Sequence, residues 1–139
     1  MYQHVLVAID GSDHSKRAAQ HALQLVEGNP AAEVAIVCAV DYGKSEKESN
    51  RGLTSEQIAS ATREYLAPFE DIFHQANVRV KSVIIHGAPG PAIVSHANEH
   101  PYDLVIIGSR GLNPVQEFVL GSVSHKVAKR VKAPVLVIK

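Results

Sequence analysis

Five short apolar runs, rich in Val and Ile and separated by helical patterns, constrain the fold of this chain most strongly. Four of them show no strict alternation of apolar and polar residues, which is typical of strands covered on both faces. The remaining run, 78–87, alternates first and then becomes wholly apolar. The runs lie at 4–9, 34–40, 78–87, 103–108 and 134–139. We therefore expect a parallel sheet enclosed between two helical layers.

Helical spacing of apolar residues fills the segments between these runs. The helices are expected to begin after a cap at Ser12 or Asp13, at a capping box formed by Thr54 and Gln57, near Pro91, and around Leu120. Pro68 falls inside the second helical pattern. Because proline lacks the N–H that an interior helical position donates, a kink or a break is predicted there.

Strand and helix alternate along the whole chain, and right-handed crossovers then give an α/β fold with a doubly wound parallel sheet. The flavodoxin-like, Rossmann-like strand order, written 3-2-1-4-5 for this chain, places a switch point between the first and fourth strands. No internal repeat or domain boundary is visible. The chain is thus expected to form one domain over residues 1–139.

Composition excludes several classes of protein. The 14 Lys and Arg residues balance 14 Asp and Glu residues, so the chain lacks the positive field that nucleic-acid binding usually needs. No apolar run approaches the roughly 20 residues of a membrane span. The single cysteine, Cys38, excludes a disulfide framework and favours a cytoplasmic setting.

Glycines flank the segment that follows the fourth apolar strand. Gly108 and Gly111 come directly after the strand, and Gly121 with Ser122 opens the last helix. The two earlier glycines are expected to permit positive φ and close approach of backbone N–H groups to a ligand, and the helix start offers an anion site. Asp10 ends the first strand, across the switch point. The arrangement predicts a phosphate site, with simple turns as the alternative interpretation.

The spacing G-x2-G-x9-G-[S/T] resembles the signature of the ATP-binding branch of the universal stress proteins. The likeness spans nearly the whole chain. It includes VLVAIDGSDHS at the start, the Gly-x-Pro step of HGAPGPAI, DLVIIGSRG, LGSVSHKV and the closing PVLVIK. A second branch of that family lacks the glycine signature and is thought not to bind ATP, so the spacing assigns the branch.

The resemblance implies a set of nucleotide-binding positions. It places Asp10 by the ribose, and Ala39 with its neighbour Val40 at adenine through the backbone. It places the phosphates at Gly108, Ser109, Gly111, Gly121, Ser122 and Val123. The predicted set also includes Ala8, Arg110 and Ser124. The implied cofactor is ATP, with ADP or AMP left open as alternatives, accompanied by Mg²⁺, for which no ligand residues are assigned.

Three classes of activity stay open at this point. A regulatory protein, in which ATP occupancy sets a conformation or the choice of partner in a stress response, is favoured. A slow ATPase or phosphotransfer enzyme is the alternative. It is less favoured because the chain has no Walker lysine and no residue that would orient water. The third is a structural dimer module without nucleotide.

The last strand predicts a homodimer through residues 134–138, with larger oligomers left open. In the order 3-2-1-4-5 this strand is an edge, and apart from Pro134 and Lys139 it lacks the charges that usually protect one. A twofold axis would pair it with its own copy, as members of the resembling family do.

The pattern H-x-x-E-H at 96–100 matches an inverted zinc-protease motif, but it is interpreted as a solvated helix end, since no third ligand accompanies it.

Overall fold

The computed structural model describes residues 2–9, 13–41, 54–109 and 121–139. Strands and helices alternate along these residues as expected. Their bounds are β1 (His4–Ala8), α1 (Asp13–Val26), β2 (Glu33–Val40), α3 (Ser55–Gln75), β3 (Arg79–His86), α4 (Pro89–Glu99), β4 (Leu104–Gly108), α5 (Ser122–Arg130) and β5 (Val135–Ile138).

The five strands form one parallel sheet in the order β3-β2-β1-β4-β5, which confirms the predicted topology. In the centre, Val7 of β1 stands opposite Ile106 of β4, and Ala8 stands opposite Val37 of β2. Because all strands run the same way, their carboxyl ends meet at one edge. β1 and β4 are neighbours there, so the switch point lies between them.

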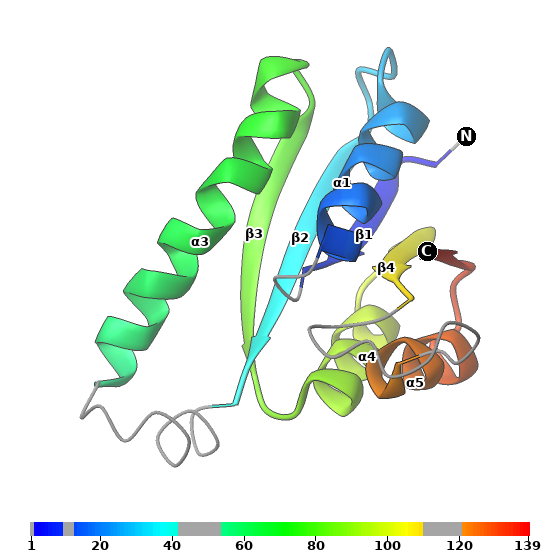
Figure 1. Ribbon diagram of the computed structural model, residues 1–139. Coiled ribbons are helices and arrows are strands. Elements are labelled where there is room, and N and C mark those ends of the chain that lie inside the picture. The colour runs from blue at the N-terminus through cyan, green and yellow to red at the C-terminus, as the bar shows by residue number, and fades with distance from the viewer. Residues whose placement is uncertain (1, 10–12, 42–53, 110–120) are drawn as a thin grey trace.

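Two helical layers cover the sheet, with α1 and α3 on one face and α4 and α5 on the other (Figure 1). Alternate side chains of β1 show why its sequence is continuously apolar. Val5 and Val7 pack under α1 and α3, whereas Leu6 and Ala8 pack under α4 and α5. All four are buried, and none of them could be polar without leaving a buried group that needs a partner.

The predicted capping box opens α3. The Thr54 hydroxyl accepts a hydrogen bond from the Gln57 N–H at 3.1 Å, and the Gln57 side chain accepts one from the Thr54 N–H at 2.8 Å. Two backbone donors of the first turn are thereby satisfied. Ser12, the other residue expected to cap a helix, lies outside the described residues, and Asp13 is the first residue of α1.

Of the kink or break predicted at Pro68, the break is wrong, because α3 continues through it from Ser55 to Gln75. Pro68 lies on the exposed side of the helix, and so does Glu64, whose carbonyl loses its intrahelical donor. Solvent can hydrate that carbonyl. Buried Leu66 and Phe69 hold the helix on the sheet on either side of the proline. Tertiary packing therefore outweighs the local cost.

Asp103 ties β1 to β4 at the amino end of the sheet. Its carboxylate accepts hydrogen bonds from the backbone N–H of Gln3 at 2.8 Å and of His4 at 3.2 Å, and its own N–H donates to the His4 carbonyl at 2.9 Å. These bonds fix how the two strands are aligned.

None of the helices in the described ranges has the length and apolarity that a bilayer crossing requires.

Candidate functional site

Ser109 joins three elements at the carboxyl edge of the sheet. It follows β4, is buried, and its N–H donates to the carbonyl of Ile138 in β5 at 2.7 Å. Its carbonyl accepts the Gly121 N–H at 2.8 Å and the Ser124 hydroxyl at 2.7 Å. The two ends of the glycine-flanked segment are therefore held together, although 109 and 121 are far apart in the sequence.

The amino end of α5 is the electropositive part of this junction. Gly121 is its N-cap, with φ −61° and ψ 158°, and no side chain caps the helix. The first intrahelical donor is His125, whose N–H bonds to the Gly121 carbonyl at 2.9 Å. The N–H groups of Ser122 and Val123 precede it, and the Ser122 side chain is exposed. Unsatisfied N–H groups and the helix dipole make such an end suited to an anion.

Ser124 contributes differently from Ser122. Its side chain is buried, and its hydroxyl lies 2.7 Å from the Ser109 carbonyl and 3.0 Å from that of Gly121. That hydroxyl is engaged in holding the junction closed. The exposed Ser122 hydroxyl is the one of the two that a molecule from solvent could meet.

Gly108 is needed for a reason that the sequence analysis did not give. The described glycines with positive φ are Gly28 and Gly87, so the positive φ expected at Gly108 is wrong. Instead, a Cβ added at Gly108 would lie 2.5 Å from the Cβ of His14 and 3.1 Å from its carbonyl carbon. The first turn of α1 approaches so closely that no other residue fits without a shift.

His14 is the site residue that sequence analysis missed. Its Nδ1 lies 3.0 Å from the Ser109 hydroxyl, and its side chain is half-buried. The histidine pattern gave no signal, because the partner is far away in the sequence. The topology could have given one, since the helix that follows β1 begins at the same edge at which β4 ends.

The remaining predicted positions divide into two groups. Ala8 ends β1 and is buried, whereas Ala39 and Val40 extend β2 beyond the end of β1 and reach the same edge of the sheet. The Val40 carbonyl accepts the Gly87 N–H at 3.0 Å, so one of its two lone pairs is used by the turn after β3. The predicted residues that lie outside the described ranges are Asp10, Arg110 and Gly111.

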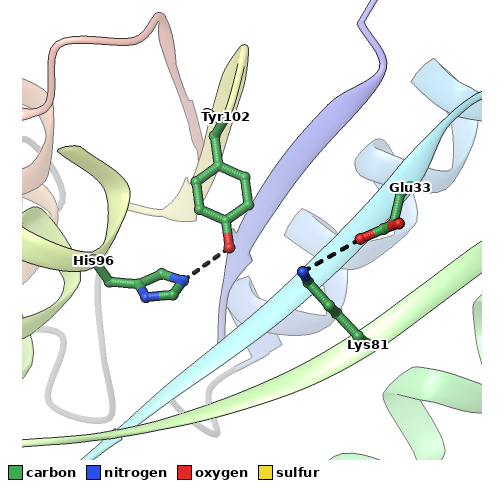
Figure 2. Close-up of polar contacts among 4 residues, drawn as sticks. All are labelled: Glu33, Lys81, His96 and Tyr102. Carbon is green, nitrogen blue, oxygen red and sulfur yellow. Dashed lines mark hydrogen bonds and ion pairs between the residues drawn. The ribbon is translucent and has the colours of Figure 1, made fainter. Parts of the chain in front are cut away.

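The H-x-x-E-H pattern ends α4 and forms an aromatic cluster. Figure 2 shows the His96 Nε2 facing the Tyr102 hydroxyl, at 2.8 Å. The His100 Nδ1–H donates to the His96 carbonyl at 2.8 Å, and the two imidazole rings are tilted by 34° with their centroids 4.2 Å apart. Glu99 and His100 are exposed, as a solvated helix end requires, but His96 is half-buried. In the described ranges no three His, Cys, Asp or Glu side chains are grouped to hold a metal ion.

Burial is the main cause that lowers the pKa of His96 from its ordinary value, and positive charge at His100 and Lys81 lowers it further, against a weaker opposing effect of Glu99. Lys81 of β3 pairs with Glu33 of β2 at 3.4 Å, as Figure 2 shows. The neutral form of His96 is therefore favoured in the folded protein.

The comparisons with known proteins define the class of this molecule. The model of the universal stress protein family matches residues 1–139, so the chain belongs to that family. A curated relative, the universal stress protein YxiE of Bacillus subtilis, is 32% identical, and the match covers the full length of both chains. The family assignment made from the glycine spacing is thereby confirmed.

Two solved structures resemble the chain over nearly its whole length. The hypothetical protein MJ0577 is 27% identical with a TM-score of 0.87, and the match covers 100% of this chain and 96% of that one. A universal stress protein solved in complex with cAMP is 31% identical with a TM-score of 0.70, covering 99% and 97% of the two chains.

We expect Gly108→Ala to destabilise the fold by about 1–3 kcal/mol, the usual cost of overpacking, because the new Cβ meets the backbone of His14. Gly90→Ala is the matched control. The Cβ added there meets the Lys126 Cδ at 2.8 Å, and a flexible side chain can move away. Urea unfolding of both variants measures the difference, and equal losses of stability would contradict the steric explanation.

We expect His96→Gln to reduce the acid sensitivity of the fold. Since the pKa of His96 is lower in the folded protein than in the unfolded chain, the unfolded chain binds more protons as the pH falls through about 6.5. Stability is therefore full above that pH and is lost below it. Melting temperatures at about pH 7.5 and pH 5.5 should differ less in His96→Gln than in the wild type.

The control is His21→Gln, which replaces an exposed histidine of α1. If His96→Gln loses as much stability on acidification as the wild type does, His96 is not the cause of the acid sensitivity.

Proposed function

We propose that this universal stress protein binds ATP, accompanied by Mg²⁺, at the carboxyl edge of the sheet between β1 and β4. The observation that carries the proposal is the junction at Ser109, which holds the end of β4 against the uncapped start of α5. The relative solved in complex with cAMP supports an adenine nucleotide as the ligand, since it is 31% identical over 99% of this chain.

The phosphates would lie beside Gly108 and Ser109 and bind the free N–H groups of the first turn of α5, because the Ser109 N–H is already bonded to the Ile138 carbonyl. Gly121 has no side chain to obstruct them, and Ser122 offers an exposed hydroxyl beside free N–H groups. An anion there gains the helix dipole and hydrogen bonds without a buried cation. Arg110 and Gly111 are proposed to complete this end, on the sequence signature alone.

The nucleoside would lie toward β2. We propose Asp10 beside the ribose, Ala8 under it, and the backbone of Ala39 and Val40 beside adenine. The turn at Gly87 uses one lone pair of the Val40 carbonyl, and the second lone pair stays available to the adenine amine.

The role that we propose is regulation in the cytoplasm by nucleotide occupancy, not turnover. Efficient phosphoryl transfer needs a dedicated metal site, in-line positioning and a cation on the transferred phosphoryl group. No grouping of three metal-ligating side chains occurs in the described ranges, and the sequence has no Walker lysine. ATP occupancy would then act by changing the conformation or the choice of partner.

Calorimetry tests the proposal directly, with ATP and Mg²⁺ titrated into the purified protein. We expect Gly121→Val to weaken binding at least tenfold, or about 1.4 kcal/mol, because the branched side chain stands where phosphate approaches. The φ and ψ of Gly121 lie in the extended region that valine adopts readily, so the fold should survive.

Ser122→Ala should cost about 0.5–1.5 kcal/mol, the usual net contribution of one hydrogen bond. Ser95→Ala, which replaces an exposed serine of α4, is the control and should leave affinity unchanged. No binding of ATP by the wild type at millimolar concentration would refute the proposed function.

We also propose that two copies pair through β5. This strand is the edge next to β4, and Val135, Leu136 and Val137 are only half-buried in the single chain. Pairing with a second copy would satisfy the free edge and cover these side chains. Universal stress proteins are expected to dimerise in this way by the family resemblance.

Val137→Asp should give monomers or insoluble protein, because the interface would bury a charge without a partner. Light scattering with a circular dichroism check of folding measures the outcome, and Lys129→Asp on the exposed side of α5 is the control. A monomeric wild type at tens of micromolar, or a dimer that Val137→Asp leaves intact, would overturn this proposal.

A further inference from the structure

We infer that His14 is the positioning residue for the phosphate end of the nucleotide site, an inference that rests on the proposed function. His14 belongs to the first turn of α1, which neither the glycine signature nor the family resemblance assigns to the site. Its Nδ1 lies 3.0 Å from the Ser109 hydroxyl, and its Cβ stands against Gly108. Both contacts fall on the residues proposed to receive phosphate.

The hydrogen bond to His14 completes the fixation of Ser109. The N–H of that serine is held by Ile138, and its carbonyl by Gly121 and Ser124. The hydroxyl is the remaining polar group, and a serine hydroxyl is otherwise free to rotate among three staggered positions. In the tautomer that suits this role, the Nδ1–H of His14 donates to the Ser109 Oγ, which leaves the hydroxyl proton for a phosphate oxygen. A ligand then meets an ordered serine and pays no entropy to order it.

The steric contact has the same effect on the backbone. Because Gly108 has no Cβ, the first turn of α1 lies directly on the end of β4. A displacement of either one toward the other would force that other to move. His14 therefore supports the Gly108–Ser109 backbone from the α1 side, while Gly121 supports it from the α5 side.

A positioning role predicts a specific pattern of affinities. Ser109 lies at the phosphate end of the proposed site. Adenine is proposed to lie farther along the same edge of the sheet, at the carboxyl end of β2. Loss of the His14 hydrogen bond should weaken ATP and AMP but leave adenosine unaffected. A variant that only destabilised the fold would weaken all three ligands in the same proportion.

The experiment compares wild type, His14→Ala, His14→Asn and Ser109→Ala by calorimetry with ATP, AMP and adenosine. His14→Ala should weaken ATP about threefold to tenfold, the loss expected for one hydrogen bond. The amide of His14→Asn reaches about as far as Nδ1 and should restore most of the affinity. His21→Ala, on the exposed side of the same helix, is the matched control and should bind like the wild type.

The double variant His14→Ala with Ser109→Ala should bind ATP no more weakly than the weaker single variant, since both remove one shared bond. Three outcomes would overturn the inference while leaving the proposed function intact: wild-type affinity in His14→Ala, an equal loss for adenosine, or additive losses in the double variant. Absence of any nucleotide binding by the wild type would instead overturn the proposed function, and the inference with it.

Discussion

The carbonyl of Ser109 accepts hydrogen bonds from the Gly121 N–H and the Ser124 hydroxyl, and the geometry of the carboxyl edge depends on those bonds. They join the end of β4 to the start of α5. The Ser109 N–H bonds in turn to Ile138, so the junction also includes the edge strand β5. An anion bound at the start of α5 would thus act on residues that share hydrogen bonds with the strand proposed to pair with a second copy. If the proposed nucleotide binding and pairing hold, occupancy would have a short physical route to assembly.

The junction exists because of the order of the strands. Parallel strands bring their carboxyl ends to one edge. From β1 the chain adds β2 and β3 on one side and then β4 and β5 on the other, and this reversal of strand order leaves α1 and α5 on opposite faces of the sheet. α1 and α5 begin at that edge from opposite sides of the sheet, and His14 and Gly121 both reach Ser109 from there. The buried side chains of β1 and β4 hold the sheet rigid below them.

The sequence predicted those features of the fold that depend on residues close together in the chain. Continuous Val and Ile runs predicted the covered strands, and Thr54 with Gln57 predicted a helix start, because both depend on nearby residues. The strand order came from the general rules for parallel crossovers and the flavodoxin-like topology, and the sheet confirms it. Three features depend on tertiary contacts and could not be predicted in this way. Pro68 is tolerated because it lies on the exposed side of α3. Gly108 is required by the approach of His14, and the bond from His14 to Ser109 spans 95 positions of sequence. All the nucleotide-binding positions stay predictions, and for Asp10, Arg110 and Gly111 even their placement is outside the described residues.

The central claim is that an adenine nucleotide binds at this junction with its phosphates on the start of α5. The most direct measurement is an amide NMR titration of isotope-labelled wild-type protein with ATP and Mg²⁺. We expect the largest shifts at Ser109, Ser122 and Val123, with smaller ones at Ala39 and Val40. Little change is expected at the hollow of about 410 Å³ between β3 and α4, around Ile85 and Ser95. Shifts confined to that hollow, or none at millimolar ATP, would contradict the account.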